Sequence, residues 1–438
     1  MSRKTALNAL IVALFVAYAA QLHSPLRLAG DSPVYLCDAT DLAKGRGFND
    51  DHLPPGYPHV LAVLNLIGLG TSGGIVALNL VSMAVGLVCI SNVLRREFGL
   101  SKREINTICL LACCSWLWVQ LVTFPLTDLL FFALSSMVLA TLSLAKERST
   151  LQAVVYVAAA AVLAAAAYFV RTIGAALFVA VAVAALETQA VRRFLGRRSA
   201  IVLLTVGVGL AAGLGLAHRN RIASPWYAGA LSYLNAPHPW RTSEEITWWR
   251  IGEVGELAQN VSSTAFAPTT ATLPIDSVSP SVMITLQLRS VRVVVGGVAL
   301  VLILAGMWSR RRQFSPVEGY FLAYVGILFI WPFDDTRFLA PILPLLLAWG
   351  WLGLRSLMPD PQKLRQFAVT YSAIFCVFGA LAMCDSLRVT FLERQRPWQE
   401  CGSYVADIPA WLSAFDQYGG VRPKLDAGRG RAQRVVPP

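Results

Sequence analysis

The chain has 438 residues, of which 56% are hydrophobic and only 14% are charged. Soluble domains carry about 25% charged residues, so an ordinary soluble enzyme, a disordered chain and a disulfide-rich secreted domain all fit poorly. A polytopic membrane protein remains. The formal net charge of +12 therefore bears on membrane orientation and anionic lipid. It does not indicate nucleic-acid binding, because basic residues occur throughout the chain and form no basic domain.

Long apolar runs recur along the chain, and a membrane-spanning helix needs about 20 mostly apolar residues. The sequence contains eleven candidate spans, at about 6–22, 74–94, 105–121, 126–145, 151–169, 172–190, 199–217, 290–308, 317–332, 338–354 and 366–385. The first run resembles a signal peptide, but it lacks a clear cleavage site and further spans follow, which predicts an uncleaved first helix. The apolar run at 58–69 is too short to span, so we expect an interfacial or re-entrant helix there.

The basic residues predict the orientation of these spans. With the N-terminus in the cytoplasm, eighteen of the 37 Lys and Arg residues fall in short cytoplasmic loops, as the positive-inside rule requires. A full span at 58–69 would place the basic clusters outside. We therefore predict a transmembrane domain at 1–386, with outer loops at 23–57 and 218–289, and a short outer tail at 387–438. The chemistry is expected on the outer face, because the cytoplasmic loops are short and mainly basic.

The first outer loop contains a predicted short helix between Gly30 and Gly45. Ser32 is a good N-cap, the next residue is a proline suited to the first helical position, and Gly45 suits the position after the C-cap. Asp31 stands just before this helix, at the mouth of the first span. Two readings of it are open: a carboxylate that favours the positive end of the helix dipole, or a general base at the membrane surface.

Other residues of this loop are candidates for binding. Asp38 and Asp41 are three positions apart and share a helix face. His52 and His59 flank a Pro-Pro-Gly-Tyr-Pro turn; they are either metal ligands or ordinary surface histidines. Cys37 and Cys401 are the two cysteines in predicted aqueous segments, which leaves open a disulfide bond between them.

Three further motifs stand at predicted outer ends of spans. Asp128 ends the segment Thr-Phe-Pro-Leu-Thr-Asp and is a helix cap, a site residue or both. Arg171 begins Arg-Thr-Ile-Gly between two apolar runs, and Arg337 lies within Trp-Pro-Phe-Asp-Asp-Thr-Arg-Phe-Leu-Ala-Pro-Ile-Leu-Pro. A cation at a helix N-terminus opposes the helix dipole, which favours an anion such as phosphate between the arginine and the free N–H groups. The alternatives are an ion pair of Arg337 with Asp334 or Asp335, and Arg171 reaching out to lipid headgroups.

Taken in order, these motifs resemble the GT-C membrane glycosyltransferases, in particular the protein O-mannosyltransferase and aminoarabinose-transferase-like group. The resemblance rests on Gly-Asp-Ser-Pro-x-Tyr and Pro-Pro-Gly-Tyr-Pro in the first outer loop, and on Asp128, Arg171 and the Arg337 motif after it. It implies an all-α polytopic fold with about eleven transmembrane helices and short juxtamembrane helices. It also implies that Asp31 is the catalytic base. The family commonly has Asp-Glu at this point, whereas this chain has Asp31-Ser32.

The resemblance implies a glycosyltransferase of the bacterial plasma (inner) membrane. It would transfer a sugar from a polyprenyl-phosphate donor to a lipid, glycan or protein acceptor in the outer leaflet or periplasm, with inversion. Arg337 and Arg171 would bind the donor phosphate, and Asp128 would be a second acidic site. A divalent cation is an optional cofactor, with Asp128 and His52 as candidate ligands. The candidates for substrate contact are Tyr35, Asp38, Asp41 and Tyr57.

Two other classes of function remain. A carrier or flippase for a lipid-linked or anionic solute would use the same arginines to hold phosphate without chemistry. However, no pair of broken helices in corresponding halves is evident, as many secondary transporters would have. A non-catalytic membrane scaffold would leave the outer Asp and Arg groups unexplained.

Overall fold

The computed structural model describes residues 3–25, 27, 31–46, 53–187, 243–259, 289–330, 336–392, 423–425 and 432–434. These residues are predominantly helical, as predicted. Their only strands are β1 (Pro423–Leu425) and β2 (Ala432–Arg434), which pair in antiparallel orientation. The predicted span 199–217, most of the outer loop 218–289, and His52 and Cys401 lie outside the described residues.

The helices follow the predicted runs in order along the chain. Their bounds are α1 (Arg3–Ala20), η1 (Gln21–His23), α2 (Ser32–Ala43), α3 (Gly56–Leu66), α4 (Ser72–Arg96), α5 (Lys102–Cys113), α6 (Trp116–Leu121), α7 (Asp128–Ala145), α8 (Thr150–Val170), η2 (Thr172–Gly174), α9 (Ala175–Glu187), α13 (Ser243–Gln259), α15 (Arg289–Ser309), η4 (Arg311–Gln313), α16 (Pro316–Ile330), η5 (Thr336–Ile342), α17 (Leu343–Leu357) and α18 (Pro361–Leu392).

Several of these helices can cross a membrane. Six in the described part of the chain are long and apolar enough by length and composition, at 72–96, 128–145, 151–170, 292–309, 336–357 and 361–391. Three shorter apolar helices cover Ala9–His23, Thr172–Glu187 and Pro316–Phe329. The multi-pass architecture is therefore confirmed, but the count of eleven spans is not.

The prediction of one continuous helix at 105–121 is wrong. Two helices, α5 and α6, occupy this segment, and the helical conformation is interrupted at Ser115. The carbonyl groups that such a break releases need partners, because a membrane interior offers no water to bind them. Asn79 of α4 serves the other end of α6: its Nδ2 donates to the carbonyl oxygens of Leu121, Val122 and Phe124 at 3.2, 3.0 and 2.9 Å. The Tyr18 hydroxyl donates to the carbonyl of Cys113, at the end of α5, at 2.6 Å.

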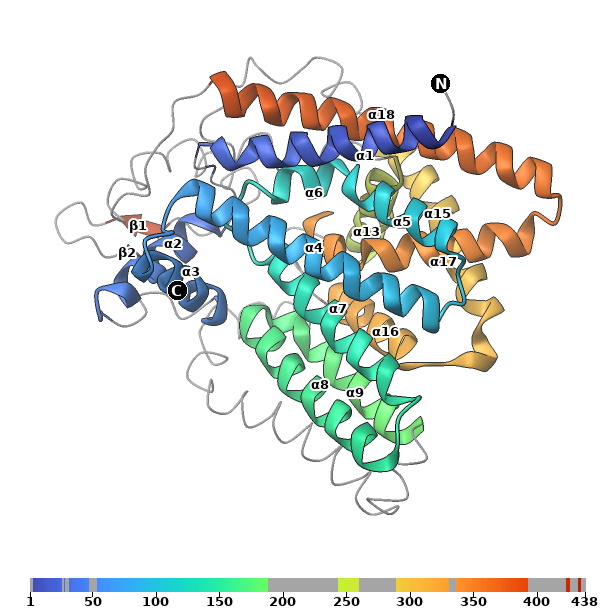
Figure 1. Ribbon diagram of the computed structural model, residues 1–438, viewed down its shortest axis with the longest axis horizontal. Helices are drawn as coiled ribbons and strands as arrows, with labels where there is room; N and C mark the ends of the chain where they lie inside the picture. Colours follow the sequence, from blue (N-terminus) through green and yellow to red (C-terminus); the bar gives the residue numbers. More distant parts are fainter. Residues whose placement is uncertain are drawn as a thin grey trace.

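The two short helices of the first outer loop are confirmed. The N-cap of α2 is Asp31 rather than Ser32, and Gly45 follows the C-cap with φ +72°, as a left-handed position requires. Helix α3 packs against α2, and the two lie together at the left-hand end of the molecule, where α4 begins (Figure 1). α1 and α18 lie side by side along the upper edge of the same view.

Three helices pack unusually closely through glycine. A Cβ atom at Gly255 of α13 would lie 1.6 Å from the carbonyl oxygen of Arg292 in α15, and one at Gly296 would lie 1.8 Å from that of Ile251. A Cβ at Gly353 of α17 would lie 1.8 Å from the carbonyl oxygen of Leu302, which also belongs to α15. Small residues allow such approach between membrane helices. Helix α13 therefore belongs to the packed bundle although it comes from a predicted outer loop.

The close approach of α17 to α15 predicts a difference between two glycines of one helix. Gly353→Ala forces the helices apart and should lower the free energy of unfolding by about 1–3 kcal/mol, the usual cost of overpacking. Gly350→Ala is the matched control, because a Cβ there meets nothing within 4 Å. Thermal unfolding of the purified protein in detergent measures both variants. Equal melting temperatures for the two would contradict the packing described.

Candidate active site

The predicted base and one predicted phosphate-binding arginine meet in the structure. Arg337 Nη2 donates to Asp31 Oδ2 at 2.8 Å, which joins the start of α2 to η5. The Asp31 carboxylate makes no capping hydrogen bond to its own helix. Its side chain is 37% exposed, whereas that of Arg337 is 13% exposed. Asp31 therefore has one face on an arginine and another open to an incoming group.

The other two predicted charged residues form a second pair. Asp128 is the first residue of α7, and Arg171 is the extended residue between α8 and η2. Arg171 Nη1 donates to Asp128 Oδ1, and the Asp128 side chain is only 1% exposed. The interpretation that Arg171 reaches lipid headgroups is therefore wrong. Asp128 Oδ2 is buried and has no hydrogen-bond partner among the described residues.

A third arginine lies beside these pairs, and sequence analysis did not identify it. The guanidinium carbons of Arg171, Arg337 and Arg250 lie 5.0, 5.5 and 6.0 Å from the ring centroid of Phe338. Cations at such distances are attracted by the face of an aromatic ring. Arg250 of α13 is buried and pairs with Glu253 at 2.9 Å. One aromatic ring thus gathers three arginines, each of which is held by a carboxylate.

Two buried tyrosines complete this part of the site. Tyr35 of α2 and Tyr57 of α3 make an edge-to-face contact with centroids 5.2 Å apart. Burial raises the pKa of Tyr35 well above its usual value, and Asp31 raises it further, while Arg337 and Arg171 act against this. Burial, and then the Asp128 carboxylate, also raise the pKa of Tyr57. Both phenols therefore stay neutral, and Tyr35 lies within the field of both ion pairs.

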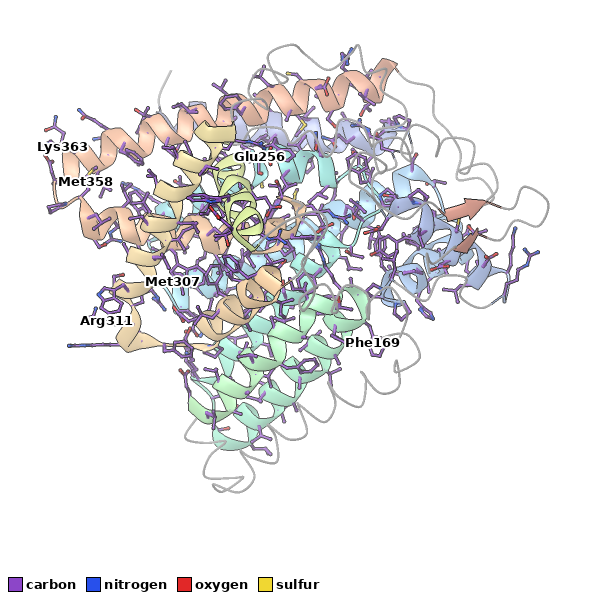
Figure 2. All side chains as sticks on the ribbon, turned by 180° about the vertical axis from the view of Figure 1, so that it is seen from behind. Phe169, Glu256, Met307, Arg311, Met358 and Lys363 are labelled. Carbon is purple, nitrogen blue, oxygen red and sulfur yellow. The ribbon has the colours of Figure 1, made fainter. Side chains whose placement is uncertain are left out.

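A close backbone contact places α3 beside the second ion pair. A Cβ atom at Gly56 would lie 2.7 Å from the backbone carbonyl carbon of Phe169, two residues before Arg171. Phe169 marks this end of α8 in Figure 2. The glycine of the Pro-Pro-Gly-Tyr-Pro turn is therefore required for this packing. The turn brings Tyr57, the next residue, to the same region.

The structure says less about the function of the remaining predicted residues. Asp38 is buried, and Asp41 lies 3.9 Å from Arg46. The exposed His59 contacts the carbonyl of Pro55 through Nδ1 at 2.7 Å. Cys37 is disulfide-bonded. Cys401, its predicted partner, lies outside the described residues.

The structure allows only one of the two suggested metal ligands, Asp128, to be placed. No group of three His, Cys, Asp or Glu side chains that could hold a metal ion occurs in the described part of the chain. One oxygen of Asp128 is taken by Arg171. His52, its suggested co-ligand, is not among the described residues.

A sequence signal for Arg250 existed, although it was not used. Arg250, Glu253 and Glu256 recur at intervals of three residues and alternate with Gly252 and Gly255. This spacing puts the three charges on one side of a helix, and the small residues allow that helix to pack closely. A charged helix with a glycine face is unusual in an exposed loop. All three charged side chains are buried in the structure.

The fold is similar to that of a known membrane transferase. A crystal structure of ArnT from Cupriavidus metallidurans bound to undecaprenyl phosphate matches with a TM-score of 0.51 and 14% identity, over 97% of this chain and 82% of that one. Its apo form matches with the same TM-score and 15% identity. An oligosaccharyltransferase from Archaeoglobus fulgidus, tethered to an acceptor peptide, matches at 0.47 and 13%, over 100% of this chain and 61% of that one.

The likeness shows an ArnT-like fold, in keeping with the all-α membrane architecture expected from the sequence. No protein-family model matches the sequence. No curated protein matches it.

The difference in burial between the two carboxylates predicts a difference in stability. Asp128→Asn leaves the buried Arg171 charge uncompensated and should cost about 3–5 kcal/mol of unfolding free energy. Asp31→Asn should cost under about 1 kcal/mol, because the Asp31 side chain is 37% exposed. Thermal unfolding in detergent tests this order. An Asp128→Asn variant as stable as Asp31→Asn would contradict this contribution of the Asp128–Arg171 pair to the free energy of unfolding.

Proposed function

We propose that the protein is a glycosyltransferase of the bacterial plasma membrane that takes a sugar from a polyprenyl-phosphate donor and transfers it to an outer-leaflet or periplasmic acceptor. The observation that carries the proposal is the contact of a half-exposed carboxylate, Asp31, with an arginine cluster around Phe338. The fold adds support, because ArnT with this fold binds undecaprenyl phosphate.

The arginine cluster suits a lipid-linked phosphate. Guanidinium groups bind phosphate through paired, charge-assisted hydrogen bonds. In the structure each arginine is neutralised by a carboxylate, so an incoming phosphate must replace at least one of them. Asp128 and Glu253 are almost fully buried, and Glu253 is held on the same helix as its partner. Asp31 is the most exposed of the three carboxylates and is therefore the one that phosphate displaces most easily.

This exchange links donor binding to the activity of the base. When Arg337 turns from Asp31 to the phosphate, the Asp31 oxygen that accepted its hydrogen bond becomes available to the acceptor. Asp31 then removes a proton from the acceptor hydroxyl or amine. The acceptor atom attacks the anomeric carbon from the side opposite the phosphate, the bond from that carbon to the phosphate oxygen breaks, and the configuration inverts.

The leaving group carries the remaining charge of the reaction. The phosphate oxygen takes the electron pair of the broken bond, and the product is the polyprenyl phosphate. Arg337 and Arg171 stabilise the charge that develops on this oxygen. Arg250 adds a third cation close by. In this proposal Asp31 removes the proton and the three arginines stabilise the charge of the leaving group.

Removal of the base should separate binding from chemistry. Asp31→Asn should lower kcat by about 10²- to 10⁴-fold, as expected for loss of a general base. It should bind the donor as tightly as the wild type or more tightly, because the Asp31 carboxylate no longer competes with phosphate for Arg337. Purified protein in liposomes, radiolabelled polyprenyl-phosphate sugars and a membrane extract as acceptor pool measure both quantities. Asp385→Asn is the control, since Asp385 is an exposed carboxylate paired with Arg388 on α18.

The substitution of Arg337, in contrast, should weaken the binding of the donor. Arg337→Gln should weaken donor binding by about 10- to 100-fold, the loss of one charge-assisted hydrogen bond.

Transfer that survives in Asp31→Asn would refute the role of Asp31 and direct attention to Asp128. Donor binding and release by the wild type without any transferred sugar would favour the carrier or flippase.

A further inference from the structure

The segment that bears Arg337 depends on other elements for its shape. η5 is a 3₁₀ helix of seven residues with Pro341 inside it. Such helices have poor hydrogen-bond geometry and are seldom this long. Two side chains from other helices hold its backbone: the Tyr324 hydroxyl donates to the Phe338 carbonyl at 2.5 Å, and Trp118 Nε1 donates to the Ala340 carbonyl at 3.1 Å.

A third contact holds the first residue of this segment. Thr336 Oγ1 donates to Glu256 Oε2 at 2.5 Å, and Arg292 Nη1 donates to the other carboxylate oxygen of Glu256 at 3.1 Å. One carboxylate therefore joins α13, α15 and η5. Glu256 and Thr336 are each about 2% exposed. Figure 2 labels Glu256 on α13, which packs against α15, α16, α18 and η5 rather than facing outward.

The charge on Glu256 is better explained by geometry than by stability. A buried ion pair such as Glu256–Arg292 gains little or nothing over well-packed apolar side chains, because both charges must leave water. A carboxylate, however, accepts shorter and stronger hydrogen bonds than a neutral group. It can thus fix a hydroxyl in one place while its second oxygen is held by an arginine.

We propose that Glu256 is a positioning residue, which acts through Thr336 to hold Arg337 at the place where donor phosphate binds. Thr336 and Arg337 are adjacent in the chain, so a shift of Thr336 moves the origin of the arginine side chain. The misplacement of a binding group by about 1 Å is enough to weaken a reaction strongly. This inference rests on the proposed function for the identity of the ligand, but the contacts do not depend on it.

Thr336→Val provides the sharpest test, because it removes the hydroxyl and leaves both the shape of the residue and the Glu256–Arg292 pair. Binding of a sugar-free polyprenyl phosphate to the purified protein in detergent should weaken about 3- to 10-fold, as for one lost hydrogen bond. The KM for the donor should rise by the same factor, with the KM for the acceptor unchanged. Thr336→Ser keeps the hydroxyl and should restore both values.

A double-mutant cycle shows whether the effect passes through the arginine. Thr336→Val should have no further effect on polyprenyl-phosphate binding in an Arg337→Gln protein, because the group that it positions is already gone. Glu256→Gln combined with Thr336→Val should bind the lipid no worse than the weaker of the two single variants. Full additivity in either combination would overturn the positioning role.

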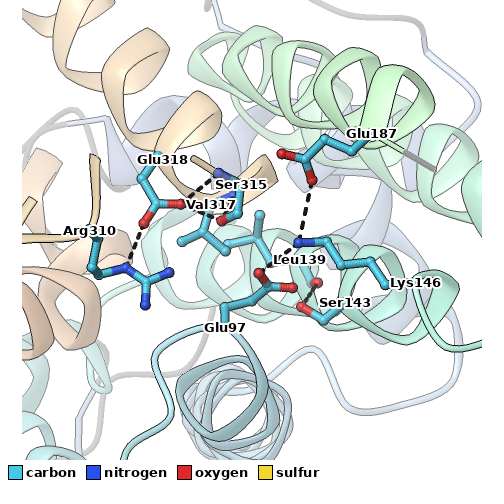
Figure 3. Close-up of polar contacts among 9 residues, drawn as sticks. All are labelled: Glu97, Leu139, Ser143, Lys146, Glu187, Arg310, Ser315, Val317 and Glu318. Atoms are coloured by element: carbon cyan, nitrogen blue, oxygen red, sulfur yellow. Dashed lines mark hydrogen bonds and ion pairs between the residues drawn. The ribbon is translucent and has the colours of Figure 1, made fainter. Parts of the chain in front are cut away.

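The chain contains a matched control for the loss of a buried carboxylate contact. Glu318, in the first turn of α16, also accepts from one arginine and one hydroxyl, those of Arg310 and Ser315 (Figure 3). This second cluster lies with Lys146, at the predicted cytoplasmic ends of the helices. Ser315→Ala and Glu318→Gln should lower the melting temperature without changing polyprenyl-phosphate affinity or the KM for the donor.

The possible results separate the two proposals. Thr336→Val with wild-type lipid affinity and KM, or with the same profile as Ser315→Ala, would overturn the positioning role alone. A wild type that binds polyprenyl phosphate but transfers no sugar would overturn the proposed function, and the binding data would still decide the role of Glu256. A wild type that neither binds nor transfers would overturn both.

Discussion

The ion pair between Arg337 and Asp31 organises the outer face of this protein, because it connects segments 306 positions apart. Neither segment is a stable unit by itself: α2 has 12 residues and η5 has seven, and helices of such length are marginal in water without tertiary packing. The pair also supplies the negative charge that Arg337 needs beside two other guanidinium groups around Phe338.

Each arginine of this cluster is fixed in a different way, and the differences follow from local structure. Arg171 stands where the chain passes from α8 to η2, and its partner Asp128 begins α7, so two helix ends are locked together. Arg250 finds Glu253 one turn along its own helix. Arg337 alone is paired with a carboxylate that remains partly open. The cluster therefore combines two buried counterions with one that is partly exposed, which suits the exchange of a counterion for phosphate in the function proposed above.

The sequence predicted the individual charged residues better than their partners. Asp31, Asp128, Arg171 and Arg337 stand out because charge is rare at the ends of apolar runs, but nothing local indicates that Asp31 joins Arg337. The alternative partners Asp334 and Asp335 lie outside the described residues. Arg250 was missed because α13 lies in a loop without an apolar run. The break at Ser115 has no local signal either: the Cys113 carbonyl beside it accepts from Tyr18, which lies 95 positions earlier in the chain.

Asp31 and Asp128 show how one functional group acquires two roles within one site. Asp31 is the N-cap of α2 and Asp128 is the first residue of α7, after the N-cap Thr127; each accepts a hydrogen bond from an arginine. Sequence position alone therefore does not distinguish them. Burial does: Asp128 is 1% exposed and its Oδ2 has no hydrogen-bond partner among the described residues, whereas Asp31 is 37% exposed. Under the function proposed above, Asp31 is therefore the one that can meet an acceptor and take its proton without the unpacking of a helix. The environment, rather than the residue type, distinguishes the two carboxylates, because burial and neighbouring groups set what each can do.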